Sequence, residues 1–172
     1  AEGVSIPALH HPRACLAAEA RTFRQAVKVP VFVAGRIRDA DDAEALLERG
    51  DADVVAMART WIAEPAWARK LREGRATEVR PCLSCNQGCV GSVFRGMPGT
   101  CVLNPRAGHE LDWPAPQPGA GRTARRSIAV IGGGPAGLET ARLAAERGFA
   151  VTLHEAGDHL GGGAIDARDH VR

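Results

Sequence analysis

The chain has 172 residues, of which 45% are hydrophobic and 24% are charged, and its formal net charge is +2. These values are ordinary for a soluble globular protein and leave room for one domain or two small ones. Because no basic stripe or block of like charge is present, they argue against nucleic acid and membrane surfaces as partners. No apolar run reaches transmembrane length and the first residues do not resemble a secretory signal, so we expect a cytoplasmic protein.

Helix-like and strand-like segments alternate along the first part of the chain. Apolar residues recur at helical spacing over 12–27, and the run VPVFVAG at 29–35 predicts a buried parallel strand. Asp39 and Gly50 are typical of the N-cap and the C-terminal stop of a second helix. The expected inner faces are Leu16, Ala20, Phe23 and Val27 in the first helix, and Ala43, Leu46 and Leu47 in the second.

A second strand and a third helix continue this order. The run ADVVAMA at 52–58 predicts another buried strand, and 64–74 reads as a helix between Pro65 and Gly74. The order β-α-β-α is typical of a parallel α/β sheet or barrel.

Four of the five cysteines then occur within twenty residues, with the spacing C-x2-C-x3-C-x11-C. A disulfide framework, a zinc site and an iron–sulfur cluster are the candidate explanations, and a reducing compartment argues against disulfides. Three ligands from one tight loop and a fourth from downstream favour a [4Fe–4S] cluster over zinc, although the spacing matches neither common ferredoxin pattern. Cys15 stands apart and is expected to be a buried small hydrophobe. The predicted ligands are Cys82, Cys85, Cys89 and Cys101.

A Pro-, Gly- and Arg-rich stretch follows and is typical of an interdomain linker, after which the α/β order restarts. SIAVI is read as a strand, GGGPAG as a turn into a helix that ends at Gly148, and AVTLHE as a second strand. The glycines fit G-x-G-x-x-G, the fingerprint of a dinucleotide-binding fold, with an acidic residue about twenty positions on.

Each residue of this fingerprint has a distinct physical role. Gly132 permits the tight turn, Gly134 lets the backbone approach a pyrophosphate, and Gly137 lets the helix pack on the strand. Glu155 can accept hydrogen bonds from a ribose diol. The predicted cofactor-binding residues of this part also include Gly133, Ala136 and Gly162; the last belongs to HLGGG at 159–163, which resembles the second glycine loop of FAD-binding reductases and favours an FAD-type ADP moiety.

The chain resembles the multi-cofactor NADH:flavin oxidoreductases that include 2,4-dienoyl-CoA reductase and trimethylamine dehydrogenase. VPVFVAGRI, GDADVVAMART, CLSCNQGC, CVLNPRAGHE and VIGGGPAGLE carry the resemblance, in the family's order. It implies the C-terminal end of an FMN-binding (β/α)8 barrel at 1–78, an iron–sulfur segment at 79–112, a linker at 113–126, and the start of a Rossmann-like FAD/NAD(P)-binding domain at 127–172. It also implies an FMN phosphate site at Gly35, Arg36, Ala58 and Arg59.

The resemblance implies a function for the parent enzyme. Electrons would pass from NAD(P)H to FAD, to the cluster, to FMN, and to an activated alkene such as a 2,4-dienoyl-CoA. The substrate would be a small molecule or a CoA thioester, with an electron-transfer protein as a further partner. Catalytic groups would lie before residue 1, so the isolated segment is expected to be inactive and poorly stable.

Two alternatives remain open at this point. One is an amine dehydrogenase or demethylase of the same family, although the C-x3-C gap resembles the dienoyl-CoA reductases more closely. The other is a zinc-stabilised nucleotide-binding module without catalysis.

Overall fold

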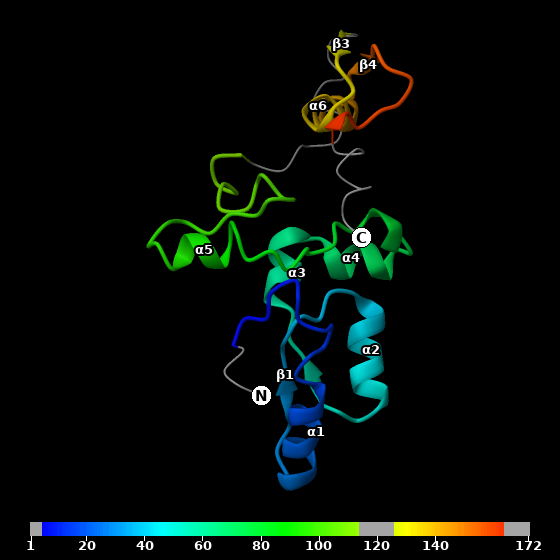
Figure 1. Ribbon diagram of the computed structural model, residues 1–172. Helices are drawn as coiled ribbons and strands as arrows, with labels where there is room; N and C mark the ends of the chain where they lie inside the picture. The colour runs from blue at the N-terminus through cyan, green and yellow to red at the C-terminus, as the bar shows by residue number, and fades with distance from the viewer. Residues whose placement is uncertain (1–4, 114–125, 164–172) are drawn as a thin grey trace. The chain divides into compact units, whose positions relative to one another are not determined.

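The structure is a computed structural model of the chain and describes residues 5–113 and 126–163. It divides into two compact units, 1–113 and 114–172. Each unit contains a pair of parallel strands with helices beside them, so the mixed α/β class expected from the sequence is confirmed (Figure 1). Most of the expected linker, 114–125, lies outside the described residues.

The first unit begins with a helix–strand repeat. Strands β1 (Phe32–Val33) and β2 (Val54–Val55) pair in parallel, with Phe32 opposite Val54. Helix α1 (Ala17–Ala26) contacts β1, and helix α2 (Ala40–Glu48) contacts β2 (Figure 1). The rest of the unit contains α3 (Ala58–Ala63), α4 (Trp67–Arg72), the 3-10 helix η1 (Ala76–Glu78) and α5 (Val90–Val93).

Helix α2 forms where the capping residues of the sequence place it. The Asp39 side chain accepts a hydrogen bond from the Asp42 backbone N–H at 3.0 Å, which confirms the predicted N-cap. Arg13 forms ion pairs with both carboxylates and so ties the segment before α1 to this helix start. Gly50 has a φ of +65°, a conformation that favours glycine, just beyond the end of the helix.

Both predicted strands are shorter than their apolar runs. Only two residues of each run pair in the sheet, and Ala58, expected in the second strand, begins α3. Helix α3 was not predicted, because it follows the strand with no intervening turn residue. The predicted third helix over 64–74 is reduced to α4, since its first residues form the corner between α3 and α4.

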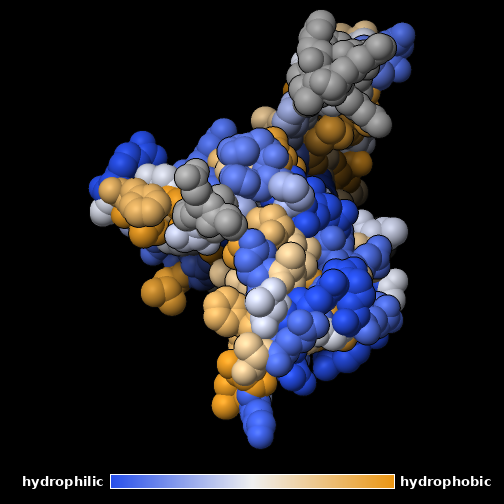
Figure 2. All heavy atoms as spheres, turned by 60° about the horizontal axis from the view of Figure 1, so that its bottom comes forward, coloured by the Kyte–Doolittle hydropathy of each residue, from blue (hydrophilic) through white to orange (hydrophobic). Residues whose placement is uncertain are grey.

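The core of this unit is small and one-sided. Leu46 is fully buried and packs with Val33 and Ile37, but Leu47 is 45% exposed and Phe32 is 68% exposed. The predictions for Leu47, Phe23 and Val27 as inner-face residues were wrong, and neither strand is buried on both sides. Figure 2 accordingly shows hydrophobic side chains gathered in exposed groups. The buried core residues are Ala20, Val33, Ile37, Ala43, Leu46 and Ala52.

The second unit is a β-α-β repeat. Strands β3 (Ser127–Ile131) and β4 (Ala150–His154) pair in parallel over five residues, with Ile131 opposite His154. Helix α6 (Pro135–Glu146) connects them and packs on both (Figure 1). It begins after Gly134, with Pro135 in its first turn, where the missing N–H of proline costs no hydrogen bond. These bounds agree with the predicted strand–helix–strand order. No helix in the described part of the chain is long and apolar enough to cross a membrane.

Candidate functional site

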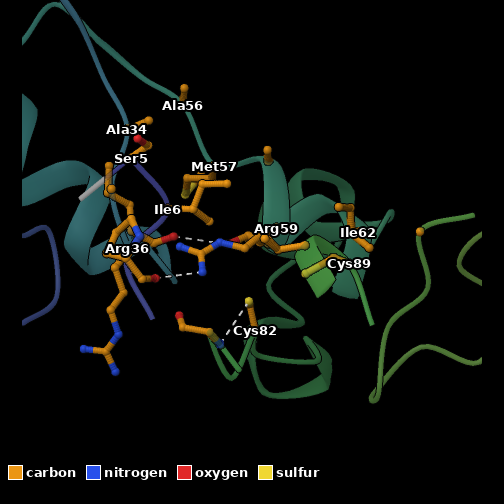
Figure 3. A pocket seen from close by; sticks show the side chains of 18 of the residues that line it. Ser5, Ile6, Ala34, Arg36, Ala56, Met57, Arg59, Ile62, Cys82 and Cys89 are labelled. Carbon is orange, nitrogen blue, oxygen red and sulfur yellow. Dashed lines mark hydrogen bonds between the residues drawn. The ribbon is translucent and has the colours of Figure 1, made fainter. Parts of the chain in front are cut away.

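The loops that follow β1 and β2 border one cavity of the first unit. Its volume is about 390 Å3, and its lining is mostly apolar. The predicted residues Gly35, Arg36, Ala58 and Arg59 all lie on its wall, because parallel strands deliver their following loops to the same edge of a sheet. Figure 3 shows the Arg59 side chain extending towards Ile6 at the edge of the cavity. The guanidinium of Arg36 points away from Arg59.

The backbone after β1 turns sharply to reach this wall. Gly35 has a φ of +135°, and Arg36 a φ of +52°, which is uncommon for a residue with a side chain. A Cβ added to Gly35 would lie 3.1 Å from Leu16, so the glycine also allows close packing. The Arg36 guanidinium donates to the His11 carbonyl, and its buried Nε has no partner among the described residues.

Arg59 connects the segment before α1 to the cysteine segment. Its Nη1 donates to the Pro7 carbonyl at 2.8 Å and to Asn86 Oδ1 at 2.6 Å. The Asn86 amide also donates to the Ile6 carbonyl at 3.2 Å. An arginine at the predicted phosphate wall is thus fixed by a residue of the cysteine loop.

The structure brings the four predicted cysteine ligands together. All four border a second, small cavity of about 20 Å3, with Arg59 as the charged residue of its described lining. None of the chain's five cysteines, all within the described residues, forms a disulfide. Within 5–113 and 126–163, however, no group of three His, Cys, Asp or Glu side chains is arranged to hold a metal ion. Cys15 lies elsewhere, with its Sγ 3.9 Å from the Gly35 carbonyl.

The loop between Cys82 and Cys89 has a strained backbone. Ser84 and Asn86 have φ values of +56° and +58°, and Ser84 is 2% exposed. The Ser84 N–H points at Cys82 Sγ, 3.3 Å away. Hydrogen bonds to sulfur are a feature of iron–sulfur sites, where they influence the reduction potential. The donor set, the common cavity and this N–H therefore fit a sulfur-ligated cluster.

Glycine explains how the fourth cysteine reaches the other three. The Thr100 N–H donates to the Gly88 carbonyl at 2.9 Å, next to Cys89 on one side and Cys101 on the other. A Cβ at Gly88 would lie 2.7 Å from Thr100 Oγ1 and 2.9 Å from its carbonyl oxygen. This close approach excludes larger residues at Gly88.

A buried polar network holds both ends of the cysteine segment against α3 and α4. Glu64 is 2% exposed and pairs with Lys70 at 2.6 Å and with Arg80 at 3.6 Å. Arg80 also donates to Asn104 Oδ1 at 3.2 Å, and the Asn104 amide donates to the Ile62 carbonyl at 2.9 Å. Burial raises the pKa of Glu64, but Lys70 and two backbone N–H groups outweigh it, so its pKa lies below the ordinary value of 4.5.

In the second unit the glycine loop has the tight geometry that its sequence predicts. Gly132 has a φ of +98°, and a Cβ at Gly137 would lie 1.9 Å from the Gly132 carbonyl oxygen, so no side chain fits there. In contrast, a Cβ at Gly134 would meet nothing within 4 Å. The packing of the protein therefore does not require glycine at Gly134. The open space beside this residue leaves room for a ligand at the start of α6. Ala136 lies exposed in the first turn of this helix.

Glu155 and the second glycine cluster lie against the same loop. Glu155 accepts from the N–H groups of Gly157 at 2.9 Å and Gly133 at 2.5 Å, and these bonds lower its pKa. The Gly161 N–H donates to the Gly133 carbonyl at 2.7 Å, and a Cβ at Gly162 would lie 3.4 Å from Gly134 Cα. The predicted cofactor-binding residues of this unit are thus neighbours.

Sequence reasoning missed the residues that support the cysteines. Ser84 and Asn86 lie in the quoted CLSCNQGC run, but a positive φ has no clear signal in a single sequence. Glu64, Arg80 and Asn104 are far apart in the sequence, so nothing local predicts their network.

Two known families match the chain. Residues 9–78 match the NADH:flavin oxidoreductase / NADH oxidase family, and residues 130–171 match the NAD(P)-binding Rossmann-like domain. The first match contains β1, β2 and the loops after them that border the larger cavity, and the second contains the glycine loop and Glu155.

Several characterised proteins are similar over most of the chain. It is 44% identical to a metal reductase of Desulforamulus reducens and 41% identical to an NADH oxidase of Thermoanaerobacter brockii, over 83% of its length in both cases. It is 37% identical to an N,N-dimethylglycine/sarcosine dehydrogenase of Chromohalobacter salexigens over 91% of its length. The chain spans only 21%, 22% and 22% of these three relatives.

Solved structures give the same grouping. A 2-naphthoyl-CoA reductase in complex with 2-naphthoyl-CoA matches 93% of the chain at 37% identity with a TM-score of 0.81. A histamine dehydrogenase from Rhizobium sp. 4-9 matches 96% at 30% identity with a TM-score of 0.82. The chain covers 24% of each of these two structures.

Proposed function

Because the chain belongs to the NADH:flavin oxidoreductase / NADH oxidase family, we propose that it forms part of an NAD(P)H-dependent iron–sulfur flavoprotein oxidoreductase. The observation that carries this proposal is the convergence of Cys82, Cys85, Cys89 and Cys101 on one cavity, next to a wall that fits a flavin phosphate. Thiolates of this kind are the usual ligands of iron–sulfur clusters.

The arrangement of the cysteines favours a cluster over a zinc ion. All four cysteines border the same cavity, three of them from one loop and the fourth from downstream. Structural zinc sites usually take two separated C-x2-C pairs, whereas three thiolates from one loop with a fourth from downstream suit a four-iron cluster.

The flavin phosphate would be held at the ends of β1 and β2. Gly35, Arg36 and Ala58 border the cavity, and the Arg59 side chain lies along its wall with the guanidinium extending towards Ile6. Charge-assisted hydrogen bonds from arginine suit a phosphate. The apolar remainder of the cavity would exclude water from the neighbouring part of the cofactor.

The second unit would bind the ADP part of FAD. The turn at Gly132–Gly134 leaves the N-terminus of α6 open to a pyrophosphate, and Glu155 lies at the end of β4 beside it. When bound, the cofactors would supply an electron path from NAD(P)H through FAD, the cluster and FMN to the substrate.

We assign an activated alkene, such as an enoyl-CoA or other enoate, as the substrate class. The similarity to a 2-naphthoyl-CoA reductase and the C-x3-C gap between Cys85 and Cys89 support this choice. Amine oxidation or demethylation is the second candidate, because the sarcosine and histamine dehydrogenases are also similar over more than 90% of the chain.

Anaerobic purification of the whole protein tests the proposal. We expect about four iron and four sulfide per chain, together with FMN and FAD, and a broad visible absorption that dithionite bleaches. NAD(P)H should reduce the protein, and cinnamate or an enoyl-CoA should reoxidise it. The turnover rate with these alkenes should exceed the rate at which the protein oxidises dimethylamine or sarcosine. A colourless protein with one zinc would contradict the proposal, and preferred amine turnover would overturn the substrate class.

A further inference from the structure

Arg59 borders both cavities of the first unit. It lines the larger cavity proposed for the flavin phosphate and the smaller one between the four cysteines. Ile62, Cys82, Ser84 and Cys89 also border both, so this group of residues forms the partition between the two spaces. Arg59 is the charged residue of that partition.

The charge of Arg59 is not neutralised by a neighbouring carboxylate. Other arginines of the unit form ion pairs, such as Arg21 with Asp51 at 2.5 Å and Arg24 with Asp53 at 2.8 Å. In the described part of the chain no carboxylate pairs with Arg59, whose two hydrogen bonds go to neutral oxygens. A partly buried guanidinium held this way keeps its full charge for an anion.

Asn86 determines where that charge lies. Its Oδ1 accepts from Arg59 Nη1 at 2.6 Å, while its Nδ2 donates to the Ile6 carbonyl at 3.2 Å, so both ends of the amide are fixed. Its backbone carbonyl accepts from the Gly91 N–H at 2.8 Å, and its φ is +58°. The residue therefore joins the loop of Cys85 and Cys89 directly to the arginine.

We propose that Arg59 is a counterion shared by the flavin phosphate and the iron–sulfur cluster, with Asn86 as the positioning residue that holds it between them. This inference rests on the proposed function. The run CLSCNQGC contains no acidic or basic residue, and Arg59 is the cation of the described lining of the cavity that the four thiolates border. A fixed cation favours the more negative, reduced form of a cluster and therefore raises its reduction potential.

The shared charge has two measurable effects. If Asn86 no longer holds Arg59, the cluster should become harder to reduce, and the flavin phosphate should lose part of its binding free energy. Riboflavin lacks the phosphate, so its binding should not change. A merely structural role for Asn86 would weaken FMN and riboflavin equally, because both contain the same ring.

The test is Asn86→Gly in the whole protein, with Gln87→Gly as the matched control. Glycine tolerates the positive φ of Asn86, and Gln87 is the exposed neighbour in the same loop. In N86G we expect a cluster midpoint potential below that of wild type in an EPR-monitored redox titration. We expect an FMN dissociation constant about tenfold higher, with unchanged riboflavin affinity. Q87G should match wild type in all three measurements.

A second variant covers the case in which N86G does not assemble its cluster. Asn86→Asp keeps an oxygen acceptor for Arg59 but places a carboxylate beside it, so it should neutralise the shared charge and lower the ratio of FMN to riboflavin affinity below that of wild type. Equal losses of FMN and riboflavin affinity, or potentials that agree between N86G and Q87G, would overturn the shared counterion. Wild-type protein without iron and sulfide would instead overturn the proposed function on which it rests.

Discussion

At the scale of single residues, the candidate cluster site is held by unusual local conformations and by buried polar contacts. Ser84 and Asn86 adopt the left-handed backbone region, which costs a non-glycine residue about 1 kcal/mol or more and persists only when the surroundings enforce it. Here the surroundings are the Arg59 guanidinium, the Ile6 carbonyl and the tight packing at Gly88. Such strain is common at functional sites, which agrees with the role proposed for this loop.

Replacement of the downstream cysteine should weaken cluster binding. We expect Cys101→Ser to lower the iron and sulfide content of the anaerobically purified protein to less than half, because a serine oxygen is a harder and poorer ligand than a thiolate. Cys15→Ser is the matched control, since Cys15 lies outside the cysteine cavity. Equal iron content in the two variants would argue against Cys101 as a ligand.

Glu64 should make a large and pH-dependent contribution to stability. We expect Glu64→Gln to lower the free energy of unfolding by about 2 kcal/mol at pH 7, because Lys70 and Arg80 then lose a buried carboxylate. The folded-state pKa of Glu64 lies below its ordinary value of 4.5, so this contribution is complete above pH 4.5 and is lost as the pH falls through the folded-state value.

Chemical denaturation at several pH values measures this contribution. The difference between wild type and E64Q should shrink as the pH falls below about 4.5. Glu73→Gln is the control, since Glu73 is 46% exposed in its pair with Arg75 and should change stability by less than about 1 kcal/mol. A difference that grows at low pH would contradict the assignment.

The sequence predicts which residues are candidates for the sites, but it does not predict which distant residues contact one another. The cysteines and the glycines could be identified because their chemistry is local and their spacing is visible along the chain. The Arg59–Asn86 bond, by contrast, joins residues 27 positions apart, and the Asn104–Ile62 bond joins residues 42 apart. A single sequence carries no signal for either pair.

At the scale of elements, the two parallel strand pairs position both candidate sites. The loops after β1 and β2 meet at one edge of the first pair, and the loops after β3 and β4 bring Gly133 to Glu155. The alternation of helices and strands was predictable, apart from the short helices α3 and α5, because apolar runs and caps recur regularly. Strand length was not, since in the described residues each short strand of the first unit has only one partner to extend its pairing.

Two glycines of the same loop should respond differently to alanine. Gly137→Ala should destabilise the second unit, because the new Cβ would lie 1.9 Å from a backbone oxygen. Gly134→Ala should leave it folded, since its Cβ meets nothing within 4 Å and its φ of −71° suits any residue, but should lower FAD content by more than tenfold. Circular dichroism and flavin analysis measure the two effects. Unchanged FAD content in G134A would contradict a pyrophosphate site.

At the scale of the whole molecule, the first unit leaves much apolar surface uncovered. Phe32, Val29 and Phe23 are 64% exposed or more. Since exposed apolar patches usually mark contacts with other protein, we expect residues 1–113 expressed alone to bind a hydrophobic dye such as ANS strongly and to aggregate. Monomeric behaviour without dye binding in the 1–113 segment would contradict this expectation.

The run from Val79 to Trp113 contains little regular structure, with α5 as its described helix. In such a stretch the backbone gains few ladder hydrogen bonds, so a cross-link between residues 82 and 101 would restrict many otherwise accessible conformations. A bound cluster would then stabilise the folded form of this part of the polypeptide, in addition to carrying electrons. Chelation should accordingly open it to proteases before any other described segment of the first unit is cut.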